Sequence, residues 1–308
     1  MSRAQRVRAL ARARDAVIIA HYYQRSEVKD VADFIGDSLA MANYAATTPA
    51  STLVVAGVRF MAETAALLNP TKTILLPEPE AGCSLATNCP AEQFSLFLQG
   101  FPDHTVVTYI NSSLEVKALS HVLCTSANAE AVINSLPENT PIVFAPDRHL
   151  GQWLRQRTGR DMVLWDAVCE VHTEFSVSEI DRLKGAFPQA RVLAHPECDA
   201  ALLEKADVIG STSRLLEEVT NGSADTYIVA TEEGILKEMR QQAPFAKLIP
   251  APQNIPNACA CGECPHMKLT TLGSLEQALV HEKEIVSIPE AQRQAALEPL
   301  MRMLELSR

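Results

Sequence analysis

The sequence has no excess of positive charge, no long apolar run and no glycine-rich nucleotide-binding motif. Its 308 residues include 27 basic and 37 acidic side chains, a formal charge of −10, which argues against nucleic acids and anionic membranes as partners. No apolar run approaches the roughly 20 residues that span a bilayer. Neither GxxxxGK(S/T) nor GxGxxG after a strand is present, so nucleotide binding is disfavoured.

A secretory signal is also lacking. Residues 1–14 are basic, but no apolar core follows them, and we expect a cytoplasmic protein. In that compartment the eight cysteines are expected to be reduced thiols or metal ligands rather than structural disulfides.

The sequence does contain one pattern stated three times. Apolar runs end at His21, Tyr109 and His195, which are separated by 88 and 86 residues. The same offsets separate a second set of motifs, Gly36-Asp37-Ser38, Cys124-Thr125-Ser126 and Gly210-Ser211-Thr212. A further apolar run in each copy leads to a cysteine: Cys83, Cys169 and one of Cys259, Cys261 and Cys264. A period of this length is that of a small domain, so we expect three copies of one domain that share a site on a pseudo-threefold axis.

The expected strands are short and apolar throughout, which is typical of strands buried on both faces of a parallel sheet. They cover residues 16–20, 34–36, 53–56 and 74–76, then 105–108, 122–124, 142–145 and 162–164, then 191–194, 208–210, 227–230 and 247–249. Because helices alternate with them, we predict an α/β protein of three αβα three-layer domains, each with about four parallel strands.

We place the three domains at residues 1–82, 83–170 and 171–285. Helices expected at 274–281 and 289–306 have no strand after them. We therefore expect both to pack back on an earlier domain, with the C-terminal segment, 286–308, on the first.

Ligands of parallel α/β sheets bind at the carboxyl ends of the strands. The polar residues that recur at the expected strand ends are His21, Tyr23, Ser38, Tyr109, Asn111, Ser126, His195, Glu197 and Thr212. A single Ser or Thr at such a position is more often a helix N-cap than a ligand contact. Recurrence in three copies favours a binding site, and a hydroxyl at a helix N-terminus suits a carboxylate or a phosphate.

Three thiolates from three domains would leave a bound metal one ligand short. They suit zinc with an open position or a [4Fe-4S] cluster with one free iron. They are also compatible with three buried thiols, the reading we adopt for Cys124 and Cys198, which do not recur in the other copies. The group Cys259, Cys261 and Cys264 is open to a further reading as a zinc knuckle or a redox pair.

Several motifs together resemble the quinolinate synthase family, and the resemblance covers essentially the whole chain. They are residues 31–38 (VADFIGDS), 60–65 (FMAETA), 81–84 (AGCS), 194–198 (AHPEC), 210–213 (GSTS) and 267–268 (MK). The resemblance implies three αβα domains and an enzyme of NAD biosynthesis. It implies condensation of iminoaspartate (iminosuccinate) with dihydroxyacetone phosphate to give quinolinate, phosphate and water.

The resemblance also implies a [4Fe-4S] cluster held by Cys83, Cys169 and Cys264, whose open iron acts as a Lewis acid in dehydration. Cys259 and Cys261 then form a redox-sensitive disulfide or have no role. The implied catalytic residues are Glu197, Tyr23 and His21. The implied substrate-binding residues are His21, Ser38, Tyr109, Ile110, Asn111, Ser126, His195, Pro196, Glu197 and Thr212.

The pathway implies one protein partner, a transient contact with L-aspartate oxidase, which supplies the imine. Two other kinds of protein remain open on the residues alone. One is another [4Fe-4S]-dependent hydro-lyase, and the other is an iron–sulfur sensor or a zinc-binding protein. A substrate assay separates the first from the family reaction, and iron and sulfide analysis separates zinc from a cluster.

Overall fold

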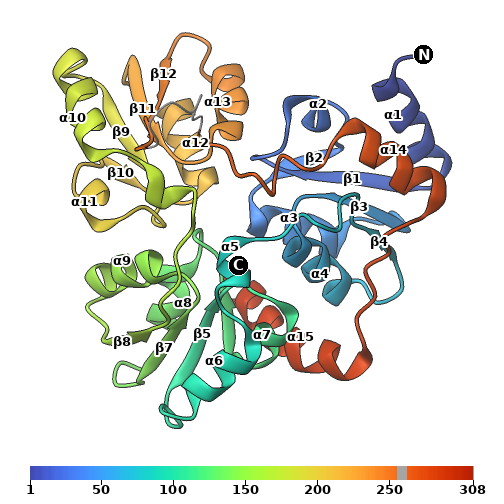
Figure 1. Cartoon of the computed structure of the whole chain (residues 1–308), viewed down its shortest axis with the longest axis horizontal. Coiled ribbons are helices and arrows are strands. Elements are labelled where there is room, and N and C mark those ends of the chain that lie inside the picture. Colours follow the sequence, from blue (N-terminus) through green and yellow to red (C-terminus); the bar gives the residue numbers. More distant parts are fainter. Residues whose placement is uncertain (255–261, 308) are drawn as a thin grey trace.

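Three four-stranded parallel sheets make up the framework of the protein (Figure 1). The computed structural model describes residues 1–254 and 262–307. The strand orders are β2-β1-β3-β4, β6-β5-β7-β8 and β10-β9-β11-β12, so the three units have one topology. Helices flank each sheet, and the prediction of three αβα three-layer units with four parallel strands each is confirmed.

Each predicted strand corresponds to an observed one. The first sheet contains β1 (Ala16–His21), β2 (Phe34–Gly36), β3 (Thr52–Ala56) and β4 (Thr73–Leu75). The second contains β5 (Thr105–Tyr109), β6 (Val122–Cys124), β7 (Ile142–Ala145) and β8 (Met162–Leu164). The third contains β9 (Arg191–Ala194), β10 (Val208–Ile209), β11 (Thr226–Ala230) and β12 (Lys247–Pro250). The central strands are buried on both faces, which explains their unbroken apolar sequences.

The helices follow the strands in alternation. They are α1 (Arg3–Ala13), α2 (Ser26–Lys29), α3 (Ser38–Thr47), α4 (Arg59–Leu68), α5 (Ser84–Thr87), α6 (Ala91–Leu98), α7 (Leu114–Ala118), α8 (Ala129–Ser135), α9 (Arg148–Thr158), α10 (Val177–Ala186), α11 (Ala200–Leu203), α12 (Thr212–Asn221), α13 (Leu236–Gln242), α14 (Leu272–His281) and α15 (Glu290–Glu305), with the short 3-10 helices η1 (His172–Glu174) and η2 (Glu233–Ile235). In the part of the chain that the structure describes, no helix has both the length and the apolar character to cross a membrane.

The units surround a common centre, with the first in blue, the second in green and the third in yellow and orange (Figure 1). One apolar core is shared by all three units. Each sheet also has a separate apolar core on its other face. The shared core fixes the units against one another, so residues that follow the strands of different sheets reach one region.

The last two helices join different units. Helix α14 packs against α1 in the first unit, although the predicted third domain, 171–285, included it. The segment between them pairs with β4, where Val286 N donates to Ile74 O at 2.9 Å and Leu76 N donates to Glu284 O at 3.1 Å. Helix α15 packs mainly on α7 and β6 of the second unit and makes a smaller contact with α4 of the first. The C-terminal segment therefore bridges two units rather than resting on the first alone.

Candidate functional site

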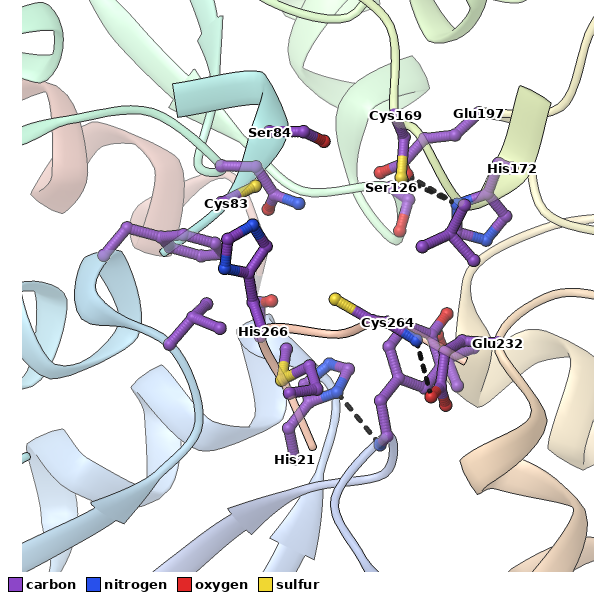
Figure 2. Close-up of a pocket in the computed structure, with 18 of the residues that line it drawn as sticks. His21, Cys83, Ser84, Ser126, Cys169, His172, Glu197, Glu232, Cys264 and His266 are labelled. Carbon is purple, nitrogen blue, oxygen red and sulfur yellow. Dashed lines mark hydrogen bonds and ion pairs between the residues drawn. The ribbon is translucent and has the colours of Figure 1, made fainter. Parts of the chain in front are cut away.

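A cavity at the centre is lined by side chains from all three units (Figure 2). It brings together nearly all the residues predicted from the repeats and the resemblance: His21, Tyr23, Ser38, Tyr109, Asn111, Ser126, His195, Glu197, Thr212, Cys83, Cys169 and Cys264. Two predicted residues do not line it. Ile110 is buried in the shared apolar core, and Pro196 is buried between His195 and Glu197 in the chain.

The first strand of each sheet delivers a polar residue to this cavity. His21 ends β1, Tyr109 ends β5, and His195 directly follows β9. Each of these strands pairs on both sides with neighbours of its own sheet, so its carboxyl end is fixed in position. The side chains that follow then converge from three directions, as expected for the carboxyl ends of parallel strands.

The hydroxyls at the helix starts are not needed for capping. Asp37 caps α3 by accepting from Ala40 N at 2.9 Å, and Ser211 caps α12 by accepting from Arg214 N at 3.3 Å. Ser38 and Thr212 are the first residues of those helices and line the cavity. Their hydroxyls, together with the N-termini of two ten-residue helices, form a favourable environment for anions.

A backbone hydrogen bond recurs at each cysteine loop. The donor is the third residue after the third strand of the sheet, and the acceptor is the residue two positions before the cysteine. The three bonds are Arg59 N to Ala81 O at 2.8 Å, Arg148 N to Ala167 O at 2.8 Å and Glu233 N to Gly262 O at 3.1 Å. By this register Cys264 is the equivalent of Cys83 and Cys169. Cys259 and Cys261 lie outside the described residues.

The three thiols of Cys83, Cys169 and Cys264 face one another across the cavity (Figure 2). None of them is in a disulfide. Burial raises the pKa of Cys83 to about 12 and that of Cys264 to about 11, and it also raises the pKa of Cys169. The charge of Cys264 adds to the shift at Cys83, and that of Cys83 adds to the shift at Cys169.

Backbone N–H groups near each sulfur lower the pKa of the thiol and partly offset the effect of burial. They belong to Ala86 and Leu85 for Cys83, to His172 for Cys169, and to Met267 and His266 for Cys264. Three thiolates in a buried space repel one another, and a bound cation would neutralise their charge. Thiolates are also the form of cysteine that binds metals. The donor set of three soft sulfur ligands with N–H support fits a metal or an iron–sulfur cluster.

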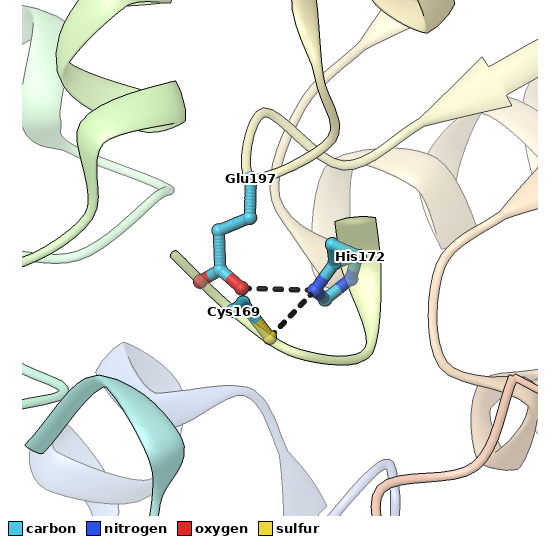
Figure 3. Close-up of side chains that lie close together, drawn as sticks. All are labelled: Cys169, His172 and Glu197. Atoms are coloured by element: carbon cyan, nitrogen blue, oxygen red, sulfur yellow. Dashed lines mark hydrogen bonds and ion pairs between the residues drawn. The ribbon is translucent and has the colours of Figure 1, made fainter. Parts of the chain in front are cut away.

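Cys169, His172 and Glu197 form a compact group at one side of the cavity (Figure 3). His172 Nδ1 is 2.9 Å from Glu197 Oε2 and 3.2 Å from Cys169 Sγ. One ligand atom from each residue lies within 4.8 Å of the others, so the group can hold a metal ion. His172 Nε2 is 3.1 Å from Thr231 Oγ1, which fixes the orientation of the ring.

Glu197 is a deeply buried carboxylate of the cavity, with 3% of its surface exposed. Burial opposes its ionisation, but electrostatic interactions with His195 and His172, with hydrogen bonds from His172 and Tyr109, hold the pKa of Glu197 below its usual range. Burial lowers the pKa of His195 to about 3, against the opposing charge of Glu197. The site therefore contains a carboxylate with several donors around it.

Tyr23 joins the first unit to the third. Its hydroxyl lies 2.8 Å from both Thr212 Oγ1 and Thr231 Oγ1. Burial raises the pKa of Tyr23 well above its usual value, so the phenol keeps its proton. His21 stacks edge-on against the Tyr23 ring at 4.5 Å, and burial with the charge of Lys29 lowers the pKa of His21 to about 3.

Asn111 supplies an acceptor with no partner in the protein. Its Oδ1 is buried, and no group in the described residues hydrogen-bonds it. A buried carbonyl of this kind is costly unless a ligand or an ordered water pairs with it. The wall of the cavity also includes Phe60, Met61 and Val58, so the space is part polar and part apolar.

Among the polar residues of the cavity that the sequence analysis did not identify are His172, Glu232 and His266. His172 follows Cys169 by three residues, a spacing common among metal ligands, and that signal could have found it. Glu232 lies two residues after β11 and is the repeat equivalent of Asp147 after β7. A comparison of the residues that follow the third strand of each sheet would have revealed Asp147 and Glu232. His266, two residues after Cys264, had no such signal.

Comparison with known proteins agrees with this geometry. The family model described as "Quinolinate synthetase A protein" matches residues 5–305. The protein named "Quinolinate synthase" from Microcystis aeruginosa is 50% identical over 301 residues, which cover 98% of this chain and 94% of that protein. The one from Gloeothece citriformis is 50% identical over 299 residues, 97% of this chain and 92% of the relative. The chain belongs to the quinolinate synthetase A family.

Proposed function

We propose that this chain condenses iminoaspartate with dihydroxyacetone phosphate to form quinolinate, phosphate and water, a step of NAD biosynthesis. Family membership over nearly the whole chain supports the proposal. The observation that carries it is the meeting of three thiols, one from each unit, with the polar strand ends in a single cavity.

A [4Fe-4S] cluster held by Cys83, Cys169 and Cys264 is part of this proposal. The repeated backbone bond supports Cys264 over Cys259 and Cys261 as the third ligand. A cluster with three protein ligands supplies, when bound, a Lewis-acidic iron that can polarise an oxygen of the substrate. Cluster chemistry requires reduced thiols, so we propose a cytoplasmic enzyme.

Anionic groups of the two substrates are proposed to bind at the helix starts. Ser38 and Thr212 offer hydroxyls at the N-termini of α3 and α12, where the helix dipole favours negative charge. Ser126 Oγ lies 3.1 Å from His195 Nε2, which makes a second pair of polar groups for a carboxylate or phosphate. These local donors oppose the overall charge of −10.

The remaining substrate contacts come from the strand ends of the second and third units. Asn111 Oδ1, which has no partner among the described residues, is proposed to accept a hydrogen bond from the substrate, and Tyr109 is proposed to lie beside it. Ile110 and Pro196 are buried, and in this proposal they position their neighbours in the chain.

Proton transfer is assigned to Glu197. His172 and Tyr109 hold its carboxylate in one orientation, and the proposed role is to take a proton next to a carbonyl group and return it. Tyr23 keeps its proton and donates a hydrogen bond, while His21 orients the Tyr23 segment by accepting from Tyr23 N at 3.2 Å. The imine substrate is short-lived in water, so a transient contact with L-aspartate oxidase is proposed as its source.

The test is an anaerobic assay of the chain after reconstitution with iron and sulfide. Iminoaspartate and dihydroxyacetone phosphate are supplied together, and quinolinate and phosphate are measured. The proposal predicts that both products form in equal amounts and that neither forms when one substrate is omitted. A cluster-loaded protein that forms no quinolinate from the two substrates would overturn it.

A further inference from the structure

The three units differ at one buried position next to the cysteine loops. The second residue after the third strand of each sheet is Val58, Asp147 or Glu232. Each directly precedes the residue whose N–H donates to the cysteine loop. The first unit therefore has an apolar side chain at the place where the second and third units have a carboxylate.

Asp147 touches the backbone of Cys169. Its Oδ2 accepts from Cys169 N at 3.3 Å, and its Oδ1 accepts from Leu150 N at 2.7 Å, which caps α9. The side chain is completely buried. Because both oxygens are held by backbone donors, Asp147 ties the start of α9 to the amide of a cysteine that faces the cavity.

Glu232 makes the corresponding contact with Cys264. Its Oε1 accepts from Cys264 N at 3.1 Å and from Lys268 Nζ at 2.6 Å, and its Oε2 accepts from Gly234 N at 2.7 Å. Glu232 is also completely buried. Lys268 in turn donates to Tyr23 O at 2.6 Å, so the Cys264 loop is tied to the first unit through this carboxylate.

We propose that Asp147 and Glu232 are positioning residues that hold Cys169 and Cys264 in the backbone conformation needed to bind the metal group. The inference rests on the proposed function, because it assumes that these thiols are ligands. Groups that orient metal ligands without touching the metal commonly change affinity by about 10- to 100-fold when removed. The Cys83 loop has the same backbone bond at Ala81, but Val58 has no side-chain acceptor to offer to the loop.

The test is a graded series of variants at each position. Glu232→Met and Asp147→Leu remove the acceptor, whereas Glu232→Gln and Asp147→Asn keep the shape and one acceptor oxygen. Each protein is reconstituted anaerobically with iron and sulfide and checked for folding by its thermal midpoint. The measurements are the rate of iron loss to a chelator and the electron paramagnetic resonance spectrum of the reduced protein.

We expect iron loss about 10-fold faster or more in the apolar variants, a smaller increase in the amide variants, and altered spectra in both. The matched control is Glu218→Gln, a buried carboxylate paired with Arg191 and Arg214 that touches no cysteine loop. It should lose iron at the wild-type rate even where its midpoint falls.

Four outcomes would contradict the account. Wild-type iron loss and spectra in folded Glu232→Met or Asp147→Leu would overturn this inference alone. If the apolar variants do not fold, iron loss and spectra like those of wild type in the two amide variants would overturn it. Iron loss from Glu218→Gln as fast as from the Asp147 and Glu232 variants would also overturn it. A wild-type chain that takes up no iron would overturn the proposed cluster and this inference with it.

Discussion

At the scale of single residues, the cavity is organised around Glu197. The carboxylate is buried and lies 2.9 Å from His172 Nδ1 and 3.9 Å from His195 Nδ1. The Tyr109 hydroxyl also hydrogen-bonds it. A carboxylate held by three neighbours in one orientation can exchange a proton with a ligand without moving first.

Glu197→Gln should abolish proton transfer without loss of the metal group. The amide keeps the size of the side chain but cannot take up a proton at neutral pH, so we expect turnover to fall by about 100- to 10,000-fold. Iron content should stay at the wild-type level, because Cys83, Cys169 and Cys264 are unchanged. Quinolinate formation at the wild-type rate by this variant would exclude Glu197 as the proton-transfer residue.

Tyr23→Phe should weaken both activity and stability. It removes hydrogen bonds to Thr212 and Thr231, and we expect the free energy of unfolding to fall by about 1–2 kcal/mol. Tyr227→Phe is a matched control, because Tyr227 is buried outside the cavity and its hydroxyl makes one 3.4 Å bond to Glu218 O. Turnover should fall in the first variant only; equal turnover in the two variants would argue against a role for Tyr23.

Much of this cavity was predictable from the sequence, because strand ends of parallel sheets meet at one edge. The repeat comparison alone isolated His21, Tyr109 and His195. The partnership of His172 with Glu197 was not predictable in this way. It depends on how the loop after Cys169 folds back toward β9, and no periodic pattern in the sequence encodes that turn.

At the scale of elements, α2 and α13 join the first and third units through a buried ion pair. Lys29 Nζ lies 2.6 Å from Glu238 Oε2 and also donates to Tyr22 O and Gly234 O. Both side chains are almost completely buried. The same lysine therefore holds the backbone beside Tyr23 against η2, next to Glu232.

Lys29→Met should destabilise the protein strongly. It leaves Glu238 buried without its partner, and breaking a buried pair in this way costs about 3–5 kcal/mol. Lys29→Met with Glu238→Met together should recover a large part of this loss, because the unpaired charge is gone. Chemical denaturation of the two single variants and the double variant measures the coupling; additive effects would mean that the pair is not a unit.

The elements themselves were predictable in existence and order, since short apolar strands alternate with helices throughout. The partners of α14 and α15 were not. Ala296, Leu300 and Met303 show that α15 has an apolar face, but the sequence does not say which unit offers the matching surface. The pairing of residues 284–286 with β4 directs the chain past the first unit and onto α7 and β6.

At the scale of the whole molecule, three units of similar backbone structure form one site to which each unit contributes different side chains. The backbone bond to each cysteine loop is the same in all three, whereas the strand ends carry different side chains. The shared apolar core holds the units together, and α15 closes it on one side. The stability of the C-terminal helix is thus part of the stability of the whole.

Leu300→Ala tests this dependence. Leu300 is completely buried between α15 and the shared core, and we expect the free energy of unfolding to fall by about 2–5 kcal/mol. Met301 is its neighbour on the exposed side of the helix, with 37% of its surface accessible, so Met301→Ala should change the free energy by about 0.5 kcal/mol or less. Denaturation that gives equal effects for both would contradict the packing of α15.

The central claim is that one thiol from each unit holds a single iron–sulfur cluster. The most direct measurement is iron and sulfide content, with an absorption spectrum, after anaerobic reconstitution of wild type, Cys264→Ala, Cys261→Ala and Cys89→Ala. Cys89 is the control, because it is a buried free cysteine that does not line the cavity. We predict about four irons and about four sulfides per chain in wild type, Cys261→Ala and Cys89→Ala, and loss of the cluster in Cys264→Ala. A full cluster in Cys264→Ala, or zinc without sulfide in wild type, would contradict the account.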